Sequence, residues 1–193
     1  MSSMIYLASR SPRRQALLAQ LGVRFEVRPA DLDETPGDGQ SPADYAVGIA
    51  LAKARAIAAA TGGERPVLGA DTDVVLDGEV LGKPADADEA GHMLGRLSGR
   101  RHQVYSAVAV VSGDRERTAL SVSEVQFAPL DERQIRDYVD SGEPLDKAGA
   151  YAIQGGAGRF VVRIEGSYSG IVGLPLYETA CLLEGRAPPG APA

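Results

Sequence analysis

The chain has 193 residues, of which 44% are hydrophobic. A chain of this size can bury a substantial core without disulfides, so we expect one domain over residues 1–185 and a disordered tail over residues 186–193. Its net charge of −6, with scattered basic residues, disfavours a nucleic acid polymer as partner. No apolar run approaches the ~20 residues that span a bilayer, and no secretion signal is recognisable, which predicts a cytoplasmic protein without membrane contact.

The first part of the chain alternates short hydrophobic runs with capped helical segments. Strands are predicted at residues 4–8 and 23–28, and a loop at residues 31–40. Helices are predicted at residues 12–22 and 42–61, because each begins with a serine cap followed by proline.

The middle and end of the chain mix hairpins with helices. A buried strand over residues 67–69 is expected to place Asp71 at its end. The later predicted strands are 74–76 paired with 80–81, a longer hairpin of 103–111 with 118–127, and 160–164, and the later predicted helices are 86–97, 131–139 and 176–183. Crossovers together with hairpins predict an α/β fold with a mixed sheet flanked by helices. Cys181, the single cysteine, lies in an apolar run and is expected to be a buried hydrophobe.

Three polar segments far apart in the chain combine cations with carboxylates: residues 9–14, 69–73 and 146–155. Cations alone would indicate passive anion binding, and carboxylates alone would indicate a bare metal site or proton transfer. Both together suit hydrolysis of a phosphate ester held with a divalent metal. An enzyme is therefore the leading hypothesis.

The first segment places Ser9, Arg13 and Arg14 at the start of a predicted helix. Exposed backbone N–H groups at a helix start favour an anion, and the guanidinium groups add to that preference. Neighbouring helix positions diverge by about 100°, so the two arginines are expected to take different roles. The alternative is an ordinary solvated, capped helix.

Asp71 is the candidate catalytic carboxylate, because ligands of open α/β sheets bind where buried strands end. Capping of the next turn is the simpler alternative. Asp73, two residues on, also makes the segment similar to the paired aspartates of phosphatases that form an aspartyl-phosphate. Asp33 and Glu34 form another acidic pair, for which solvated loop residues are the alternative.

The remaining candidates are single polar residues. Lys53 and Lys83 each resemble ordinary surface lysines when taken alone. Gln154 offers the donor and acceptor that a base edge requires, and it follows a glycine-containing loop that can approach a ligand closely. His102 is expected to have a structural or orienting role, since neither histidine has a partner at zinc-ligand spacing. P-loop and dinucleotide-binding signatures are absent from the sequence.

Several of these motifs, in order over residues 5–185, resemble the Maf family of nucleoside triphosphate pyrophosphatases. The segments that carry the resemblance are Ser9–Arg14, Asp33-Glu34, Lys53-Ala54, Gly69–Thr72, Gly82–Pro84, Ser98-Gly99 with His102 and Val104, Asp146–Gly149 and Gly173–Pro175. The resemblance implies two lobes around a cleft, as in ITPase-like folds, a homodimer, and hydrolysis of a nucleoside triphosphate to the monophosphate and pyrophosphate with Mg²⁺ or Mn²⁺. Removal of modified nucleotides and a link to cell-division arrest are also associated with the family.

Branches of that family differ at three positions, which here are Arg13, Thr72 and Gln154. This combination is similar to the dTTP/UTP branch rather than the 7-methyl-GTP branch, which carries tryptophan, glutamine and glutamate there. Two residues depart from the family pattern. Arg10 stands where a small or neutral residue is usual, and Asp73 replaces an apolar residue, a change expected to affect metal affinity.

The resemblance leads to a mechanistic hypothesis. Asp71 is expected to be the general base and, with Glu34, a metal ligand. The residues expected to bind substrate are Ser9, Arg13, Arg14, Lys53, Thr72, Lys83 and Gln154, with Gln154 contacting the pyrimidine. One alternative is a phosphomonoesterase with Asp71 as nucleophile and Asp73 as acid, and another is a nucleotide-binding regulatory protein with little turnover.

Overall fold

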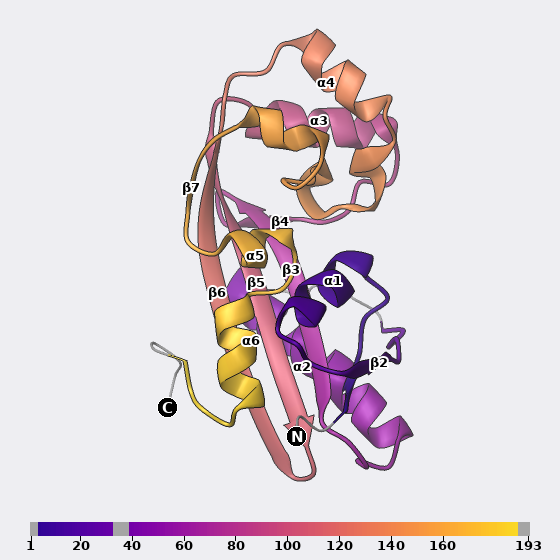
Figure 1. Cartoon of the computed structure of the whole chain (residues 1–193). Helices are drawn as coiled ribbons and strands as arrows, with labels where there is room; N and C mark the ends of the chain where they lie inside the picture. The colour runs from indigo at the N-terminus through magenta and orange to yellow at the C-terminus, as the bar shows by residue number, and fades with distance from the viewer. Residues whose placement is uncertain (1–3, 33–38, 189–193) are drawn as a thin grey trace.

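A seven-stranded mixed sheet forms the centre of the molecule, in a computed structural model that describes residues 4–32 and 39–188 (Figure 1). The strands are β1 (Ile5–Leu7), β2 (Phe25–Val27), β3 (Val67–Leu76), β4 (Glu79–Leu81), β5 (Arg101–Ser112), β6 (Arg115–Phe127) and β7 (Val161–Glu165). Their order is β2-β1-β3-β5-β6-β7, with β4 also paired to β3. Strand β1 is parallel to β2 and β3, and the other pairs are antiparallel. The predicted mixed α/β sheet is confirmed.

Four of the helices begin at side-chain caps where the sequence predicts them, at Ser11, Ser41, Asp86 and Asp131. The helices are α1 (Pro12–Gln20), α2 (Pro42–Ala60), α3 (Ala87–Leu97), α4 (Glu132–Val139), α5 (Tyr168–Val172) and α6 (Leu176–Leu183). Ser11 Oγ accepts the Arg14 backbone N–H, and Asp131 forms a reciprocal capping box with Gln134. Within the described part of the chain, no helix combines the length and the apolar character needed to cross a membrane.

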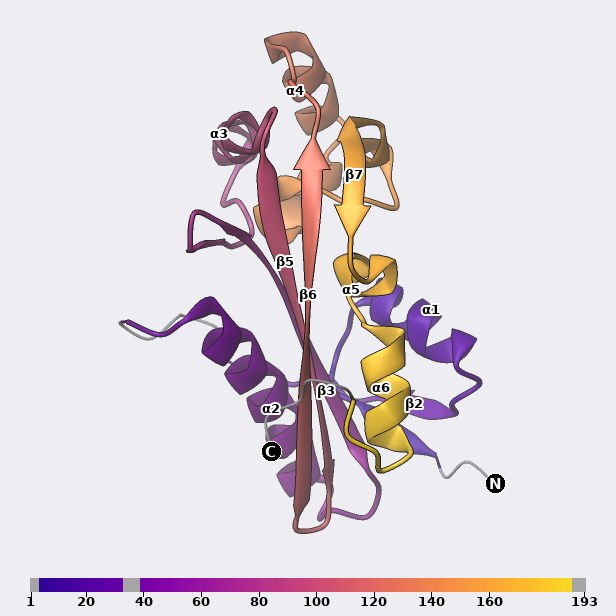
Figure 2. The same cartoon turned by 90° about the vertical axis from the view of Figure 1, so that its left-hand side faces the viewer.

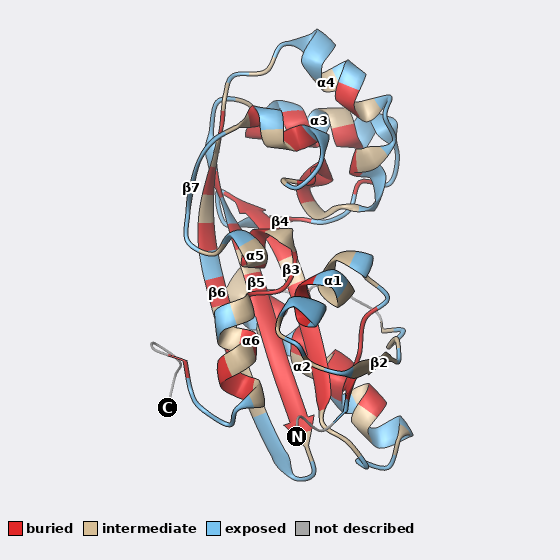
Figure 3. Cartoon of the chain, viewed as in Figure 1, coloured by how far each residue is buried: buried red, intermediate tan, exposed pale blue. Residues whose placement is uncertain are grey.

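Two lobes share the long β5–β6 hairpin, which runs through both of them (Figure 2). In one lobe, α2 covers one face of the sheet while α1, α5 and α6 cover the other. In the other lobe, α3 and α4 cover a separate hydrophobic cluster that includes Leu94, Phe127 and Tyr138. Buried residues follow β3 and β5 between these layers (Figure 3). Cys181 is fully buried, as predicted.

The prediction that a strand ends before Asp71 is wrong, since β3 continues to Leu76. Residues 69–73 remain in the ladder because they pair along one edge with β5, from Gly69 opposite Ala109 to Asp73 opposite Tyr105. The other edge of β3 pairs with β1 only at residues 67–68 and with β4 only at residues 74–76. Among the described residues, no strand pairs with this edge between those two segments. Asp71 therefore lies beside an opening within the sheet rather than at a strand end.

Gly69 allows α2 to lie directly against β3 next to this opening. A Cβ atom at this position would lie 2.1 Å from the Ala50 carbonyl oxygen and 2.9 Å from the Ala54 nitrogen. Both clashes are with helix backbone, which cannot move aside as a flexible side chain can. The spacing between α2 and β3 thus depends on glycine here.

Gly69→Ala is expected to lower the free energy of unfolding by about 1–3 kcal/mol, because the added methyl group forces α2 away from the sheet. Urea denaturation followed by circular dichroism measures the change. Gly95→Ala is the matched control, since Gly95 lies within α3 and nothing approaches within 4 Å of its added Cβ. That control is expected to gain about 0.5–1 kcal/mol from helix propensity. Equal stability of the two variants would contradict the prediction.

Candidate active site

One cavity of about 880 Å³ opens beside the unpaired edge of β3, between the two lobes. Every predicted site residue that the structure describes lines it: Ser9, Arg13, Arg14, Lys53, Asp71, Thr72, Lys83 and Gln154. The predicted metal ligand Glu34, with Asp33, lies outside the described residues, as do residues 189–193 of the predicted tail. The fold thus brings distant polar segments to one cavity, and their individual roles stay predictions.

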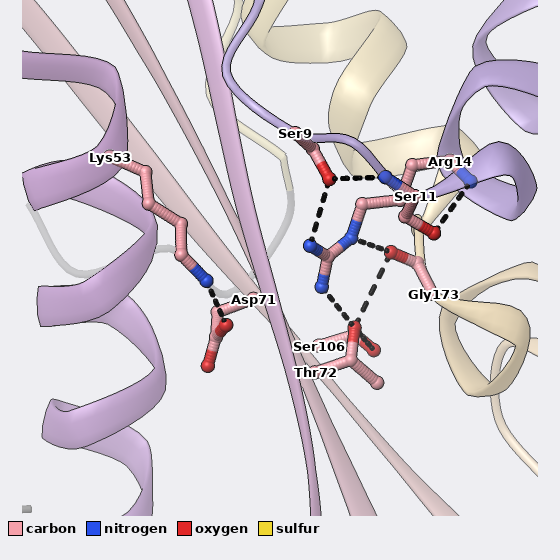
Figure 4. A network of polar contacts seen from close by, with 8 residues as sticks. All are labelled: Ser9, Ser11, Arg14, Lys53, Asp71, Thr72, Ser106 and Gly173. Atoms are coloured by element: carbon pink, nitrogen blue, oxygen red, sulfur yellow. Dashed lines mark hydrogen bonds and ion pairs between the residues drawn. The ribbon is translucent and has the colours of Figure 1, made fainter. Parts of the chain in front are cut away.

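Lys53 and Asp71 form a buried ion pair at the base of this cavity. Lys53 Nζ donates to Asp71 Oδ1 at 2.7 Å, and each side chain is only 8% exposed. Lys53 comes from the middle of α2, which the contact at Gly69 holds against β3 (Figure 4). Lys53 is therefore not the surface lysine that its helix position alone would indicate. The ammonium holds the carboxylate of Asp71 in one orientation.

Asp73 lies on the same face of β3 as Asp71, because alternate strand residues point the same way. It is 7% exposed, and its buried Oδ2 atom has no hydrogen-bond partner in the described part of the chain. Burial, followed by the charge of Asp71 and a hydrogen bond with it, raises the pKa of Asp73 to about 8. Lys53 and Arg14 offset this rise only in part. The cavity therefore contains two adjacent buried carboxyl groups.

Arg14 lies on the opposite side of β3 from Asp71, where it bonds to β3, to the loop after β1 and to the residue after α5 (Figure 4). Its Nε donates to the Gly173 carbonyl at 2.9 Å, its Nη1 to Ser9 Oγ at 3.3 Å and its Nη2 to Thr72 Oγ1 at 3.4 Å. Ser106 Oγ donates to the same threonine oxygen at 3.2 Å. These bonds position the start of α1 relative to the sheet. Arg14 and Thr72 thus have structural partners in addition to their place in the cavity wall.

The segment after η1 (Glu143–Asp146) forms the opposite wall of the cavity and contains a cation that sequence reasoning missed. The Lys147 side chain is 13% exposed and pairs with Asp146. The hydrogen bond from Lys147 Nζ lowers the pKa of the Asp146 carboxyl group, and the charge of Arg13 lowers it to a smaller extent. The 146–155 segment was singled out for its mixed charge, but nothing in it marked Lys147 as the residue that turns inward.

Arg10, one of the two departures from the family pattern, lies at the exposed rim of the same cavity. It forms a two-point ion pair with Asp31, with nitrogen–oxygen distances of 2.9 and 3.2 Å. Both side chains are largely exposed, so the pair adds little to stability. It joins the loop after β1 to the loop after β2.

Comparison with known proteins identifies the family of this chain. Residues 4–186 match the family model described as Maf-like protein. The chain belongs to the Maf-like family. It is 51% identical over 193 residues to a protein of Aromatoleum aromaticum named "dTTP/UTP pyrophosphatase", covering 93% of this chain and 94% of the relative. An Escherichia coli O157:H7 protein with the same name is 54% identical over 179 residues, covering 93% of this chain and 91% of the relative.

A solved structure supports the same fold. A HAM1 protein from Coxiella burnetii superposes with a TM-score of 0.55 at 20% sequence identity, over 94% of this chain and 98% of that one. At this identity the likeness concerns the fold alone. It agrees with the predicted α/β fold with a mixed sheet flanked by helices.

His102 of this Maf-like protein supports the cavity wall from behind. It is 3% exposed, and its Nε2 lies 2.9 Å from the hydroxyl of Tyr151, which lines the cavity. Its ring also packs edge-on against Phe127 and Tyr151. Burial lowers the pKa of His102 to about 4, so the ring is neutral at pH 7. These contacts are consistent with the expected orienting role.

Acidification is expected to destabilise the protein partly through His102. In the unfolded chain a histidine has a pKa of about 6.5, so between pH 6.5 and 4 the unfolded state binds a proton that the folded state excludes. The free energy of unfolding should fall by up to about 3 kcal/mol over this window. Urea denaturation at several pH values, compared with His102→Phe, measures the difference. The same pH slope in both proteins would contradict the assignment.

The donor atoms in the cavity fit a hard divalent cation. Mg²⁺ and Mn²⁺ prefer oxygen ligands, and the carboxyl groups of Asp71 and Asp73 offer such atoms, including the Asp73 Oδ2 that has no partner among the described residues. Among residues 4–32 and 39–188, no group of three or more acidic, histidine or cysteine side chains meets in one place. The remaining ligands would come from Glu34, outside the described residues, from water or from substrate phosphates.

Proposed function

We propose that this Maf-like protein hydrolyses dTTP and UTP to the nucleoside monophosphate and pyrophosphate. The observation that carries the proposal is the cavity itself, where the buried Lys53–Asp71 pair faces a set of cations drawn from distant segments. The names of relatives that share about half of its residues support the same reaction. Three residues that the family resemblance predicts to set specificity, Arg13, Thr72 and Gln154, line this cavity.

Asp71 acts in this proposal as the general base. It takes a proton from the attacking water as the water oxygen bonds to the α-phosphorus and the bond to the bridging oxygen of the β-phosphate breaks. Pyrophosphate leaves with the electron pair of that bond. Asp71 and Glu34 would hold a divalent cation, which when bound supplies charge stabilisation at the phosphoryl oxygens. Lys53 keeps the Asp71 carboxylate oriented toward the cavity.

The cations around the cavity have a separate task. Arg13, Lys53 and Lys83 balance the charge of the triphosphate and of the departing pyrophosphate. Ser9, Arg14 and Thr72 line the wall near the start of α1, where backbone N–H groups favour a phosphate. Gln154 is exposed at the cavity edge, where its amide can contact a pyrimidine.

A product assay tests this proposal against both alternatives. The purified protein is incubated with each common nucleoside triphosphate and Mg²⁺ or Mn²⁺, and the products are separated by anion-exchange chromatography. Release of pyrophosphate, with dTTP and UTP preferred, supports the proposal. Inorganic phosphate without pyrophosphate would indicate a phosphomonoesterase, and bound dTTP without any product would indicate a regulatory binding protein.

Three further expectations extend this proposal. Modified pyrimidine triphosphates added to the same assay test whether the enzyme removes altered nucleotides, and a link to cell-division arrest stays a prediction. A homodimer is expected from the family resemblance, and light scattering after gel filtration measures it. A cytoplasmic location also stays a prediction.

A further inference from the structure

The hydrogen bond with Asp71 uses only part of the hydrogen-bonding capacity of the Asp73 carboxyl group. Asp73 is more than nine-tenths buried, and its Oδ2 is enclosed without a hydrogen-bond partner among the described residues. A buried polar atom left without a partner costs about 1–3 kcal/mol. An apolar side chain at this strand position would avoid that cost.

The location of Asp73 indicates what such an atom would bind. Asp71 and Asp73 alternate on one face of β3, both line the cavity, and a hydrogen bond links their side chains. Lys53 Nζ donates to Asp71 Oδ1. Two adjacent carboxylates match the charge and the oxygen preference of a small divalent cation.

We infer that Asp73 is a second aspartate ligand for the divalent cation, so that this chain holds the metal between two carboxylates of one strand. The identity of the metal site rests on the proposed function, while the added ligand is a property of this chain. Asp73 would give the free protein a tighter metal site than Asp71 could form without it. The orphaned Oδ2 then becomes a metal ligand in the loaded enzyme.

Binding of Mn²⁺ to the nucleotide-free protein tests the inference without any activity measurement. Electron paramagnetic resonance of free Mn²⁺ gives the dissociation constant for the wild type, Asp73→Asn and Asp73→Val. Both variants are expected to bind Mn²⁺ at least about tenfold more weakly. Asp31→Asn is the matched control, because Asp31 lines the same cavity but is 77% exposed and paired with Arg10. It should change the constant by less than about twofold.

Folding is checked by thermal denaturation without metal. Asp73→Val should melt at or above the wild-type temperature because the orphaned polar atom is gone, and Asp73→Asn should melt near the wild-type temperature because its amide is still polar. Wild-type Mn²⁺ affinity in both variants would overturn the inference. If the wild type releases pyrophosphate but the Asp73 variants bind Mn²⁺ as tightly as it does, this inference is overturned and the proposed function stands. An Asp73-dependent metal site in a protein that releases no pyrophosphate would instead overturn the proposed function.

Discussion

Asp71→Asn is expected to lower kcat for dTTP hydrolysis by about 10²–10⁴-fold, because the amide cannot accept the proton of the attacking water. The fold should be retained, since the asparagine oxygen can still accept the Lys53 ammonium and Asp73 remains nearby to balance its charge. Steady-state kinetics at saturating dTTP and Mg²⁺, with pyrophosphate as the measured product, gives the change in kcat.

Binding of the substrate separates a chemical effect from a structural one. Equilibrium dialysis with dTTP should show an affinity for Asp71→Asn within a few-fold of wild type, since the cations that line the cavity are unchanged. Hydrolysis of dTTP by this variant at the wild-type rate would show that Asp71 is not the base.

Lys53→Met is expected to lower the free energy of unfolding by about 3–5 kcal/mol at pH 7, because Asp71 then lies buried opposite an apolar side chain. The two charges of the pair are shielded from water almost equally, each being 8% exposed. Urea denaturation measures the loss of stability. The rate of dTTP hydrolysis should fall as well, since the orienting ammonium is absent.

Lys83→Ala is the matched control, because Lys83 lines the same cavity but is exposed. It should reduce hydrolysis while leaving the free energy of unfolding within about 0.5 kcal/mol of wild type. The double variant Lys53→Met/Asp71→Asn should recover part of the stability lost in Lys53→Met, since no unpaired charge remains. A Lys53→Met protein as stable as wild type would mean that the ion pair is not important for folding.

Most helices were predictable because their ends are encoded locally. Ser11 followed by Pro12 marks the start of α1, and the predicted bounds of the final helix are those observed for α6. Helix α5 was not predicted, since its five residues contain no complete turn-to-turn hydrophobic pattern. The predicted length of β3 was also wrong, because the polar residues Asp71 and Asp73 are not typical of a buried strand. Pairing with β5 keeps them extended.

The candidate site was predictable as a set of residue types but not as a geometry. Motif order indicated that Arg13, Asp71 and Gln154 belong to one family pattern, and all three line one cavity. Local sequence contains no signal for the burial of Lys53, because a lysine in an alanine-rich helix has the same pattern whether that face meets solvent or a sheet. The inward position of Lys147 depends in the same way on how its loop folds.

The sequence by itself determined the helix ends, the hairpin turns and the family to which the chain belongs, because these depend on residues close together or on motifs in a given order. The tertiary structure decided that Lys53 pairs with Asp71. Within residues 4–32 and 39–188, it also left an edge of β3 unpaired between β1 and β4 and buried Asp73 without a partner for Oδ2. Those features arise from contacts between segments far apart in the chain. Charge, burial and hydrogen bonding at each atom follow only when those segments are in place.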